Sequence, residues 1–406
     1  MTSTLQPGSP PQAVPEVRTV GIVLGGLALC HMINDTLQSL LPALYPVLQA
    51  NYALTFTQIG LLHFAFQFTA SLLQPVVGLA TDRRPRVRLL PIGMGLTLSG
   101  LVLLAFAHSY LVLIAAAMAV GLGSAIFHPD SSRLARLASG GRFGFAQSLF
   151  QVGGNAGTAL GPLLAAYVVL PLGQPSVAWF TLLALAGMAV LWRIGSWAKA
   201  EQARRAAVRR AGGAAAGHGL PRARVLGTIG ILLLLIFSKH VYVVSLASFY
   251  TFYLIETFGV TVRQSQLLLF LFLAASAVGT FAGGPIGDRI GRKAVIWVSI
   301  LGVLPFTLLL PHANLVGTAI LSVLIGLILS SAFSAIVVYA QNLVPNRIGL
   351  ISGLFFGFAF GVAGAGAALI GMLADAHGVA FVFQLCAWLP AIGLLAAFLP
   401  RDGRAR

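Results

Sequence analysis

Charged residues are scarce in this 406-residue chain, and acids are the scarcest of them. Asp and Glu together number nine against 25 Lys and Arg, and charged residues make up 8% of the chain, whereas a soluble domain carries about 25%. So few charges cannot cover the surface of a water-soluble body of this size. With 58% hydrophobic residues, the composition excludes a soluble globular protein and indicates that lipid is the solvent.

Cysteine is also rare, because the chain has only Cys30 and Cys386. Both lie inside apolar segments without a spacing motif, so we interpret them as packing residues rather than a disulfide or a metal site. No metal-ligand cluster, nucleophile elbow or phosphate-binding loop is recognisable, and the sequence predicts neither an enzyme nor a cofactor or metal. The net charge of +16 would suggest nucleic acid as a partner of a soluble protein, but its placement between apolar stretches argues against that.

Long apolar stretches dominate the chain, and about twelve of them reach the roughly 20 residues that a membrane-spanning helix needs. A polar, Arg-rich stretch near 197–222 divides them six and six. We therefore predict an all-α membrane protein with twelve transmembrane helices in two six-helix bundles. The predicted parts are a tail at 1–19, a first bundle at 20–196, a basic linker at 197–222, a second bundle at 223–400 and a tail at 401–406.

The positive charges gather on one side of this predicted arrangement. If the N-terminus lies in the cytoplasm and the stretches alternate, about 23 of the 25 Lys and Arg fall in cytoplasmic segments. The outside loops then hold only Arg263, and Lys239 lies inside a helix. Because positive charge concentrates on the cytoplasmic side of membrane proteins, we predict that both termini and the linker are cytoplasmic.

Two copies of a short motif lie about 206 positions apart, at 78–86 and 284–293. Each copy has a glycine, an aspartate four residues later and then a basic cluster. The repeat continues beyond this motif, since Arg142-Phe143-Gly144 has its counterpart in Arg347-Ile348-Gly349. Two similar halves in parallel orientation are typical of a large class of transporters that bind substrate between the halves, near the membrane midplane.

With these residues the chain resembles the major facilitator superfamily, and over its whole length it resembles the fosmidomycin resistance protein family of bacterial efflux transporters. The motif at 284–293 is specific for the superfamily, whereas the copy at 78–88 has Pro85 where glycine is usual. Longer and more specific strings in both halves carry the closer resemblance: SLLQPVVG (71–78), FHPDSSR (127–133), SGGR (139–142), AQSLFQVGGN (146–155), FSK (237–239) and SGLFFGFAFG (352–361).

This resemblance implies a major facilitator fold and a proton-coupled exporter, that is, an antiporter. It would expel the antibiotic fosmidomycin, and other small drugs or organic anions, by alternating access. It also implies the bacterial inner membrane as the location, with protons and lipid as partners, and we expect a monomer. An importer or facilitator of a small organic anion would share the fold and stays open as the alternative, which the direction of proton flux would separate.

Asp35 lies well inside the first apolar stretch, and an intramembrane carboxylate is expensive enough to be a functional candidate by default. We predict that Asp35 loads and releases protons, with His128 as the second candidate, because histidine is a common proton carrier in proteins. His31 and Gln38 share a helix face with Asp35 and are predicted to line a substrate cavity. The alternative for Asp35 is a structural hydrogen bond that ties the first helix to a neighbour.

Lys239 is a cation deep in a predicted helix, and a cation between the two halves suits an anionic phosphonate. It could instead pair with Asp35 or extend to an aqueous edge. Other polar side chains are predicted to line the substrate cavity, with helix packing as the alternative. They are His63 and Gln67, one turn apart, and Gln147, Gln151 and Asn155 at four-residue spacing. Tyr242 is predicted to join them in an aromatic wall, with an aromatic belt at the outer membrane interface as its alternative.

The resemblance also assigns gating roles at the predicted cytoplasmic helix ends. Asp82 and Asp288 would hold a neighbouring helix end and nearby arginines while the cytoplasmic gate is closed, because a carboxylate is stabilised beside a helix N-terminus and an Arg. Charges that merely set the topology would explain the arginines but not the aspartates. The basic residues predicted to take part are Arg83, Arg142, Arg289 and Arg292.

The segment from Gly157 through Gly161 to Pro162 resembles the first half of the signature of drug–proton antiporters in this superfamily. Its second half, normally Gly-Gly, is Ala165-Ala166 here. Glycines at four-residue spacing let two helices approach closely, and Pro162 removes a backbone donor and permits a bend. Ordinary tight packing of membrane helices explains the same residues.

Overall fold

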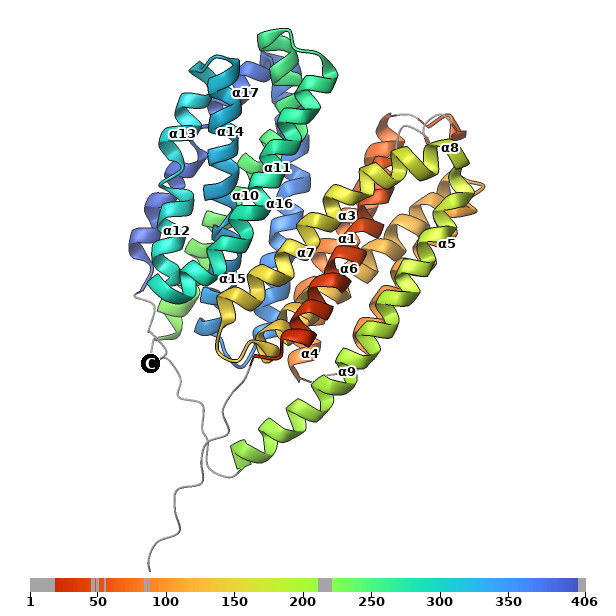
Figure 1. Ribbon diagram of the computed structural model, residues 1–406, viewed down its shortest axis with the longest axis vertical. Coiled ribbons are helices and arrows are strands. Elements are labelled where there is room, and N and C mark those ends of the chain that lie inside the picture. Colours follow the sequence, from red (N-terminus) through yellow and green to blue (C-terminus); the bar gives the residue numbers. More distant parts are fainter. Residues whose placement is uncertain are drawn as a thin grey trace, which may run out of the picture.

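The computed structural model describes residues 19–44, 48, 51–54, 56–83, 86, 88–210 and 221–400. Within them the chain is helical, without a strand, and forms two bundles that stand side by side (Figure 1). The first bundle consists of α1 (Gly21–Ala43), α3 (Phe56–Leu72), α4 (Gln74–Arg83), α5 (Leu89–Ala105), α6 (Tyr110–Ala138), α7 (Phe143–Leu164), η1 (Ala165–Val169), α8 (Leu170–Leu172), η2 (Gln174–Phe180) and α9 (Thr181–Arg210). The second consists of α10 (Arg222–Phe258), α11 (Val262–Ile290), α12 (Arg292–Ile300), α13 (Leu304–Leu309), η3 (Leu310–His312), α14 (Leu315–Ser330), α15 (Ala332–Leu343), α16 (Ile348–His377), α17 (Val379–Cys386) and η4 (Leu389–Phe398).

Membrane-length helical segments make up both bundles. Nine segments in the described part of the chain are long and apolar enough to cross a membrane, three in the first bundle and six in the second. The apolar α5 is shorter, and α1 and α7 carry the polar faces discussed below. These three helices complete six segments in the first bundle, so the predicted all-α fold with twelve transmembrane helices in two bundles is confirmed.

Helix ends and breaks follow from local sequence. Thr261 caps α11 in a capping box, because its hydroxyl accepts the N–H of Gln264 while the Gln264 side chain accepts the N–H of Thr261. The Asn314 side chain likewise accepts the N–H of Gly317 at the start of α14. Prolines inside long helices, Pro129 in α6 and Pro285 in α11, remove one backbone donor each, which a membrane bundle tolerates.

The helix before the predicted linker is longer than the sequence suggested. α9 continues to Arg210, so residues 197–210 of the predicted linker are helical. Alanine, arginine and glutamate are good helix formers, and Arg204 pairs with Glu201 one turn earlier at 2.9 Å. The rest of the linker from 211 to 220, the tail at 1–18 and the tail at 401–406 lie outside the described residues.

Both ends of the described chain lie at the same end of the molecule, which we call the tail end. There Thr19 donates a hydrogen bond to the Ser139 carbonyl, and Lys293 donates one to the Leu399 carbonyl. The two bundles come together towards this end, shown at the bottom of Figure 1, where α4 and α15 lie. Across the boundary between the halves, α16 packs against α3, α4 and α6, and α11 packs against α7.

Candidate functional site

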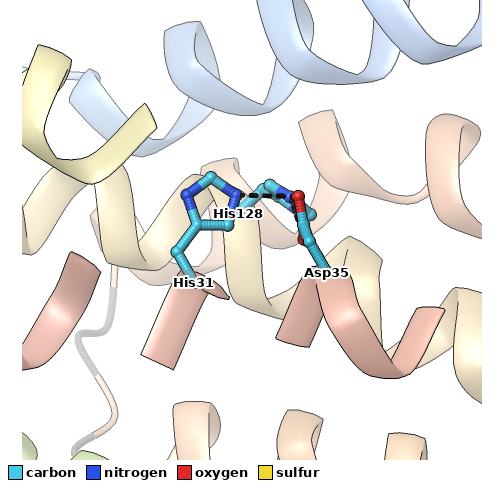
Figure 2. A group of neighbouring side chains, drawn as sticks. All are labelled: His31, Asp35 and His128. Carbon is cyan, nitrogen blue, oxygen red and sulfur yellow. Dashed lines mark ion pairs between the residues drawn. The ribbon is translucent and has the colours of Figure 1, made fainter. Parts of the chain in front are cut away.

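A buried group of three titratable side chains joins His31 and Asp35 of α1 with His128 of α6 (Figure 2). His31 Nε2 lies 3.3 Å from Asp35 Oδ2, and His128 Nε2 lies 3.4 Å from Asp35 Oδ1. Both histidines are fully buried, whereas the Asp35 side chain keeps 15% of its surface exposed. The structure thus brings the two predicted proton-coupling residues into contact and adds His31, which the sequence suggested as a substrate ligand.

Backbone carbonyls hold both imidazole rings in place. His31 Nδ1 lies 2.7 Å from the carbonyl oxygen of Phe150 in α7, and His128 Nδ1 lies 3.0 Å from that of Ser124, one turn earlier in α6. A carbonyl oxygen can only accept a hydrogen bond, so we assign the ring proton to each Nδ1. The Ser124 hydroxyl, 3.2 Å from His128 Nδ1, is then a second acceptor for that proton. Each Nε2 therefore faces Asp35, and neither Nε2 has a hydrogen bond of good geometry to another group.

Aromatic rings enclose this cluster from both halves of the protein. The His31 ring stacks on Phe150 with centroids 4.0 Å apart, and Phe127 packs on both imidazoles. From the second half, α16 contributes Phe356 and Phe360, whose ring centroids lie 5.3 and 5.1 Å from that of His128. The cluster is thus in direct contact with a helix that belongs to the other bundle.

Glycines on α7 allow this helix to lie directly on α1. A Cβ atom at Gly154 would lie 2.5 Å from His31 Nε2 and 2.8 Å from Asp35 Oδ2. At Gly157 and Gly161 a Cβ would lie 2.2 Å from the Met32 carbonyl oxygen and 1.8 Å from Ser39 Oγ. The glycines of the antiporter-like segment therefore set the contact between α7 and α1, the element that carries Asp35; Pro162 follows within α7.

Two polar neighbours of Asp35 on α1 complete its surroundings. Asn34, which the sequence analysis did not single out, donates from Nδ2 to Asp35 Oδ1 at 3.1 Å. Its position next to Asp35 is the feature of the sequence from which this contact could have been predicted. Gln38 is buried one turn beyond Asp35, and its Nε2 has no hydrogen-bond partner among the described residues.

Lys239 is buried in α10 of the second half and does not pair with Asp35. Its Nζ lies 5.2 Å from the centre of the Phe333 ring, and the Phe333 ring packs edge-on against Phe356 at 5.2 Å. Phe356 in turn touches His128, so two aromatic rings separate the lysine from the carboxylate cluster. The suggested ion pair between Lys239 and Asp35 is absent from the described structure, in which Asp35 pairs with the two histidines.

The polar stripe on α7 joins this helix to α6 of the first half and to α11 of the second half. Gln147 Oε1 accepts a hydrogen bond from Ser132 at 2.8 Å, and Asn155 Nδ2 donates to Thr280 of α11 at 3.2 Å. Gln151 lies between them, and its buried Oε1 has no hydrogen-bond partner among the described residues. In this conformation Gln147 and Asn155 connect helices. This is the helix-packing role that the sequence analysis gave as the alternative to lining a cavity.

The remaining predicted substrate residues lie apart from the three-residue cluster. His63 is in α3 beside Phe66, with ring centroids 6.4 Å apart. Gln67, one turn on, faces α16, where a Cβ at Gly364 would lie 3.8 Å from the Gln67 Nε2. Tyr242 is buried in the hydrophobic core.

At the tail end, each half contributes a carboxylate that caps a helix of the other half. Asp82 at the end of α4 accepts the backbone N–H groups of Gly349 and Leu350, both at 2.8 Å, in the first turn of α16. Asp288 at the end of α11 accepts those of Gly144 and Phe145, at 2.9 and 3.0 Å, in the first turn of α7. Both carboxylates satisfy N–H groups that a helix start leaves unpaired and face its positive dipole end.

Glycine pairs bring the backbones together beside these caps. A Cβ at Gly78 would lie 2.0 Å from the Gly349 carbonyl oxygen, and a Cβ at Gly284 would lie 2.1 Å from that of Gly144. Any larger residue at either position would hold the two halves apart. The four glycines occupy equivalent places in the sequence repeat, so the contact has the two-fold character of the repeat.

The predicted gating arginines differ in what they contact. Arg292 donates from Nη2 to Asp288 Oδ1 at 3.1 Å, as expected. Arg83 and Arg289 are exposed, and Arg142 is exposed with its guanidinium 4.6 Å from the centre of the Phe145 ring. The aspartates therefore hold mainly backbone N–H groups, with one arginine at the second site.

A polar network between the halves at the tail end was not predicted. Arg136 of α6 donates to Gln341 Oε1 at 3.2 Å and to Asn342 Oδ1 at 2.5 Å in α15, while its guanidinium lies 3.9 Å above the Phe143 ring. Gln341 Nε2 also donates to Ser132 and Ser352. Arg136 and Gln341 are 205 positions apart, the offset of the repeat, and that spacing could have identified them.

The cluster of His31, Asp35 and His128 offers donor atoms of the types that bind metal ions. The two Nε2 atoms and the Asp35 carboxylate lie within 4.8 Å of one another, and such a set could hold a divalent ion. The sequence predicted no metal-ligand group because His128 is distant from Asp35 along the chain. Protons are the simpler occupants, since they would satisfy both contacts to the carboxylate without an ion.

The membrane-length helices, the repeated halves and the polar cluster enclosed by side chains of both halves define a multi-pass membrane transporter. The family model of the Major Facilitator Superfamily matches residues 27–253 and 232–406. The chain is 54% identical to the fosmidomycin resistance protein of Escherichia coli (strain K12) over 385 residues, which is 95% of this chain and 94% of that protein. It is 42% identical over 388 residues to the uncharacterized MFS-type transporter YfnC of Bacillus subtilis (strain 168), covering 96% and 95% of the two chains.

Solved structures show the same fold at low sequence identity. A variant of the E. coli fucose:proton symporter FucP superposes with a TM-score of 0.72 at 15% identity, over 94% of this chain and 98% of that one. The human organic anion transporter MFSD10 (TETRAN) gives 0.69 at 19% identity, over 95% and 100%. The chain belongs to the fosmidomycin resistance family of the major facilitator superfamily, and it is therefore a transporter of a small molecule and not an enzyme.

Proposed function

We propose that the protein is a proton-coupled exporter of fosmidomycin and related small organic anions, which works as a monomer in the inner membrane of a bacterium. The substrate class comes from the relative that is 54% identical over nearly the whole chain and is named for fosmidomycin resistance. The coupling rests on one observation, the Asp35 carboxylate between two imidazoles inside the bundle. Exchange of internal drug for external protons would make the transporter an antiporter.

Coupling needs a proton site whose occupancy alters the contact between the two halves. Asp35 and His128 would be that site, because the His128 ring packs on Phe356 and Phe360 of the opposite half. A change of charge on the cluster changes its attraction for these aromatic faces and its cost of burial. Proton binding would thereby bias the position of α16 relative to α1.

Alternating access requires the tail end to open and close. The carboxylate caps at Asp82 and Asp288 and the glycine contacts beside them must separate when this end opens. By the positive-inside rule the tail end would be cytoplasmic, because the described helix ends there carry Arg83, Arg136, Arg142 and Arg292. We interpret the present conformation as closed to the cytoplasm.

The anionic head group of the substrate would bind at Lys239. This buried cation has no acidic partner among the described residues and lies against the face of Phe333. An uncompensated buried charge is costly, and an anion would offset that cost. Gln151, whose Oε1 is unsatisfied, is the stripe residue best placed to contribute a further hydrogen bond.

Transport into inside-out vesicles tests this function. We expect fosmidomycin to accumulate when the vesicle interior is acidic, to accumulate little without the gradient, and to lose the gradient dependence in Asp35→Asn. Glu201→Gln is the matched control, since it makes the same acid-to-amide change on the α9 extension. Full gradient-driven accumulation in Asp35→Asn would move the proton site elsewhere, and no transport in the wild type would reject the substrate. Uptake in the opposite direction would indicate an importer.

A further inference from the structure

We infer that His31 is a second proton carrier, and that the cluster binds two protons, one on each Nε2, in the conformation with the tail end closed. This inference rests on the proposed proton coupling and deepens it, because it sets the number of protons and names a residue that the sequence assigned to substrate. The argument depends on which ring nitrogens are already committed to hydrogen bonds.

The Nδ1 atoms are committed. His31 donates its Nδ1–H to the Phe150 carbonyl at 2.7 Å. His128 donates its Nδ1–H to Ser124, whose carbonyl oxygen lies at 3.0 Å and whose hydroxyl oxygen lies at 3.2 Å. In the neutral form each imidazole carries one proton, which these bonds place on Nδ1. Any further proton on either ring must therefore be on Nε2, the atom that faces Asp35.

Whether the contacts to Asp35 are attractive or repulsive then depends on how many protons the cluster holds. Without a bound proton, two nitrogen lone pairs would face a carboxylate at 3.3 and 3.4 Å, which is repulsive on both sides. One proton would relieve one contact and leave the other. Two protons make both contacts ion pairs, with an imidazolium on each side of the carboxylate, and the two similar distances fit this state.

The surroundings favour two cations and one anion. The elements packed on the cluster bring aromatic rings, namely Phe127 from α6, Phe150 from α7, and Phe356 and Phe360 from α16. The Phe150 ring stacks on His31, and an aromatic face attracts a cation. Asn34 of α1 donates to Asp35 Oδ1 and so stabilises the carboxylate as an anion. Lys239, the cation on α10, is screened from His128 by Phe333 and Phe356.

Gly154 explains how both contacts are made at once. A side chain there would strike His31 Nε2 and Asp35 Oδ2, so glycine leaves α7 close enough for Phe150 to hold His31 while its ring still reaches the carboxylate. The arrangement therefore depends on three helices, α1, α6 and α7, and movement of any of them would change the proton affinity of the pair of histidines.

The direct test is 15N NMR of histidine-labelled protein in lipid nanodiscs at neutral pH, in which the shift of each Nε2 separates protonated from unprotonated nitrogen. His31→Gln and His128→Gln assign the two signals among the eight histidines of the chain. We expect both Nε2 atoms to be protonated. An unprotonated Nε2 on either ring, or a transition metal found at one equivalent in protein purified without chelator, would overturn the inference.

A second measurement keeps the inference separate from the proposed function. In proteoliposomes, the membrane potential at which fosmidomycin flux stops gives the proton-to-substrate ratio. We expect about two in the wild type and about one in His31→Gln, with transport retained, and about two in His312→Gln, an exposed histidine at the other end of the bundle. A ratio of one that His31→Gln leaves unchanged would reject the second carrier and keep the exporter. Two protonated histidines without any proton coupling would keep the doubly protonated cluster but reject both the carrier role of His31 and the coupled exporter.

Discussion

Asp288 at the end of α11 accepts the backbone N–H of Gly144 in α7 at 2.9 Å, across the boundary between the two halves. In the equivalent contact, Asp82 of the first half accepts the backbone N–H of Gly349 in the second half at 2.8 Å. Since each carboxylate belongs to one half and each helix start to the other, the two contacts close the tail end together. The repeat in the sequence thus corresponds to two equivalent contacts between the halves.

Replacing Asp288 by Asn should open the tail end more often. An amide keeps the size of the side chain but loses the charge that the helix N-terminus stabilises, which is worth about 1 kcal/mol. Labelling of a Ser132→Cys reporter, buried between the halves, should then become about fivefold faster with a maleimide reagent. The native cysteines are buried and should react slowly. Glu201→Gln should leave the rate unchanged, and an unchanged rate in Asp288→Asn would show that the contact does not hold the gate.

Adding a methyl group at Gly284 should prevent the tail end from closing. A Cβ there would lie 2.1 Å from the Gly144 carbonyl oxygen, so Gly284→Ala must push α11 away from α7. Transport should fall strongly while the reporter at Ser132→Cys becomes accessible. Gly287→Ala is the matched control in the same motif, because its Cβ would meet its nearest neighbour at an ordinary 3.6 Å. Equal transport in the two variants would contradict the close contact.

Gly154→Ala should uncouple transport from the proton gradient. The new methyl group would displace His31 or Asp35 from the contact that they now make, and such overpacking also costs about 1–3 kcal/mol of stability. Accumulation of fosmidomycin should therefore lose its dependence on the pH gradient. Gly25→Ala on α1, where nothing lies within 4 Å, should behave as wild type. If Gly154→Ala folds and remains fully coupled, the glycine has no part in the cluster.

Removing the charge of Lys239 should weaken substrate binding without unfolding the protein. A hydrogen bond to a charged group contributes about 1.5–3 kcal/mol, so the Kd for fosmidomycin should rise about ten- to a hundredfold in Lys239→Gln. Calorimetry on purified protein would measure it, and the melting temperature should not fall, since a buried cation without an acidic partner is removed. Lys199→Gln on the exposed face of α9 is the control. Unchanged affinity in Lys239→Gln would remove the lysine from the binding site.

The sequence was sufficient to predict the features that repeat in the two halves or follow helical periodicity. Apolar length predicts the twelve spans, and the offset between the two motifs predicts that Asp82 and Asp288 have equivalent positions. Helical spacing places His31 and Asp35 on one face of α1. Each of these depends on local rules that the membrane enforces strictly, because every backbone polar group in lipid must be paired within a helix.

What the sequence could not predict is which helices touch. His128 reaches Asp35 only because α6 crosses α1 at that level, and His31 faces the carboxylate only because the Phe150 carbonyl of α7 occupies its other nitrogen. Likewise, Lys239 is separated from Asp35 by two phenylalanine rings whose orientations depend on tertiary packing. The residue types indicated chemistry, and the three-dimensional contacts decided the partners.

The reciprocal arrangement of the two carboxylate caps has a consequence for energy conversion. A carrier driven by an ion gradient wastes the gradient whenever a path stays open from one side of the membrane to the other. Because the Asp82 and Asp288 contacts are separate, a fluctuation that loosens the first leaves the second in place. Both contacts must break before this end opens, so the fold itself would limit slippage.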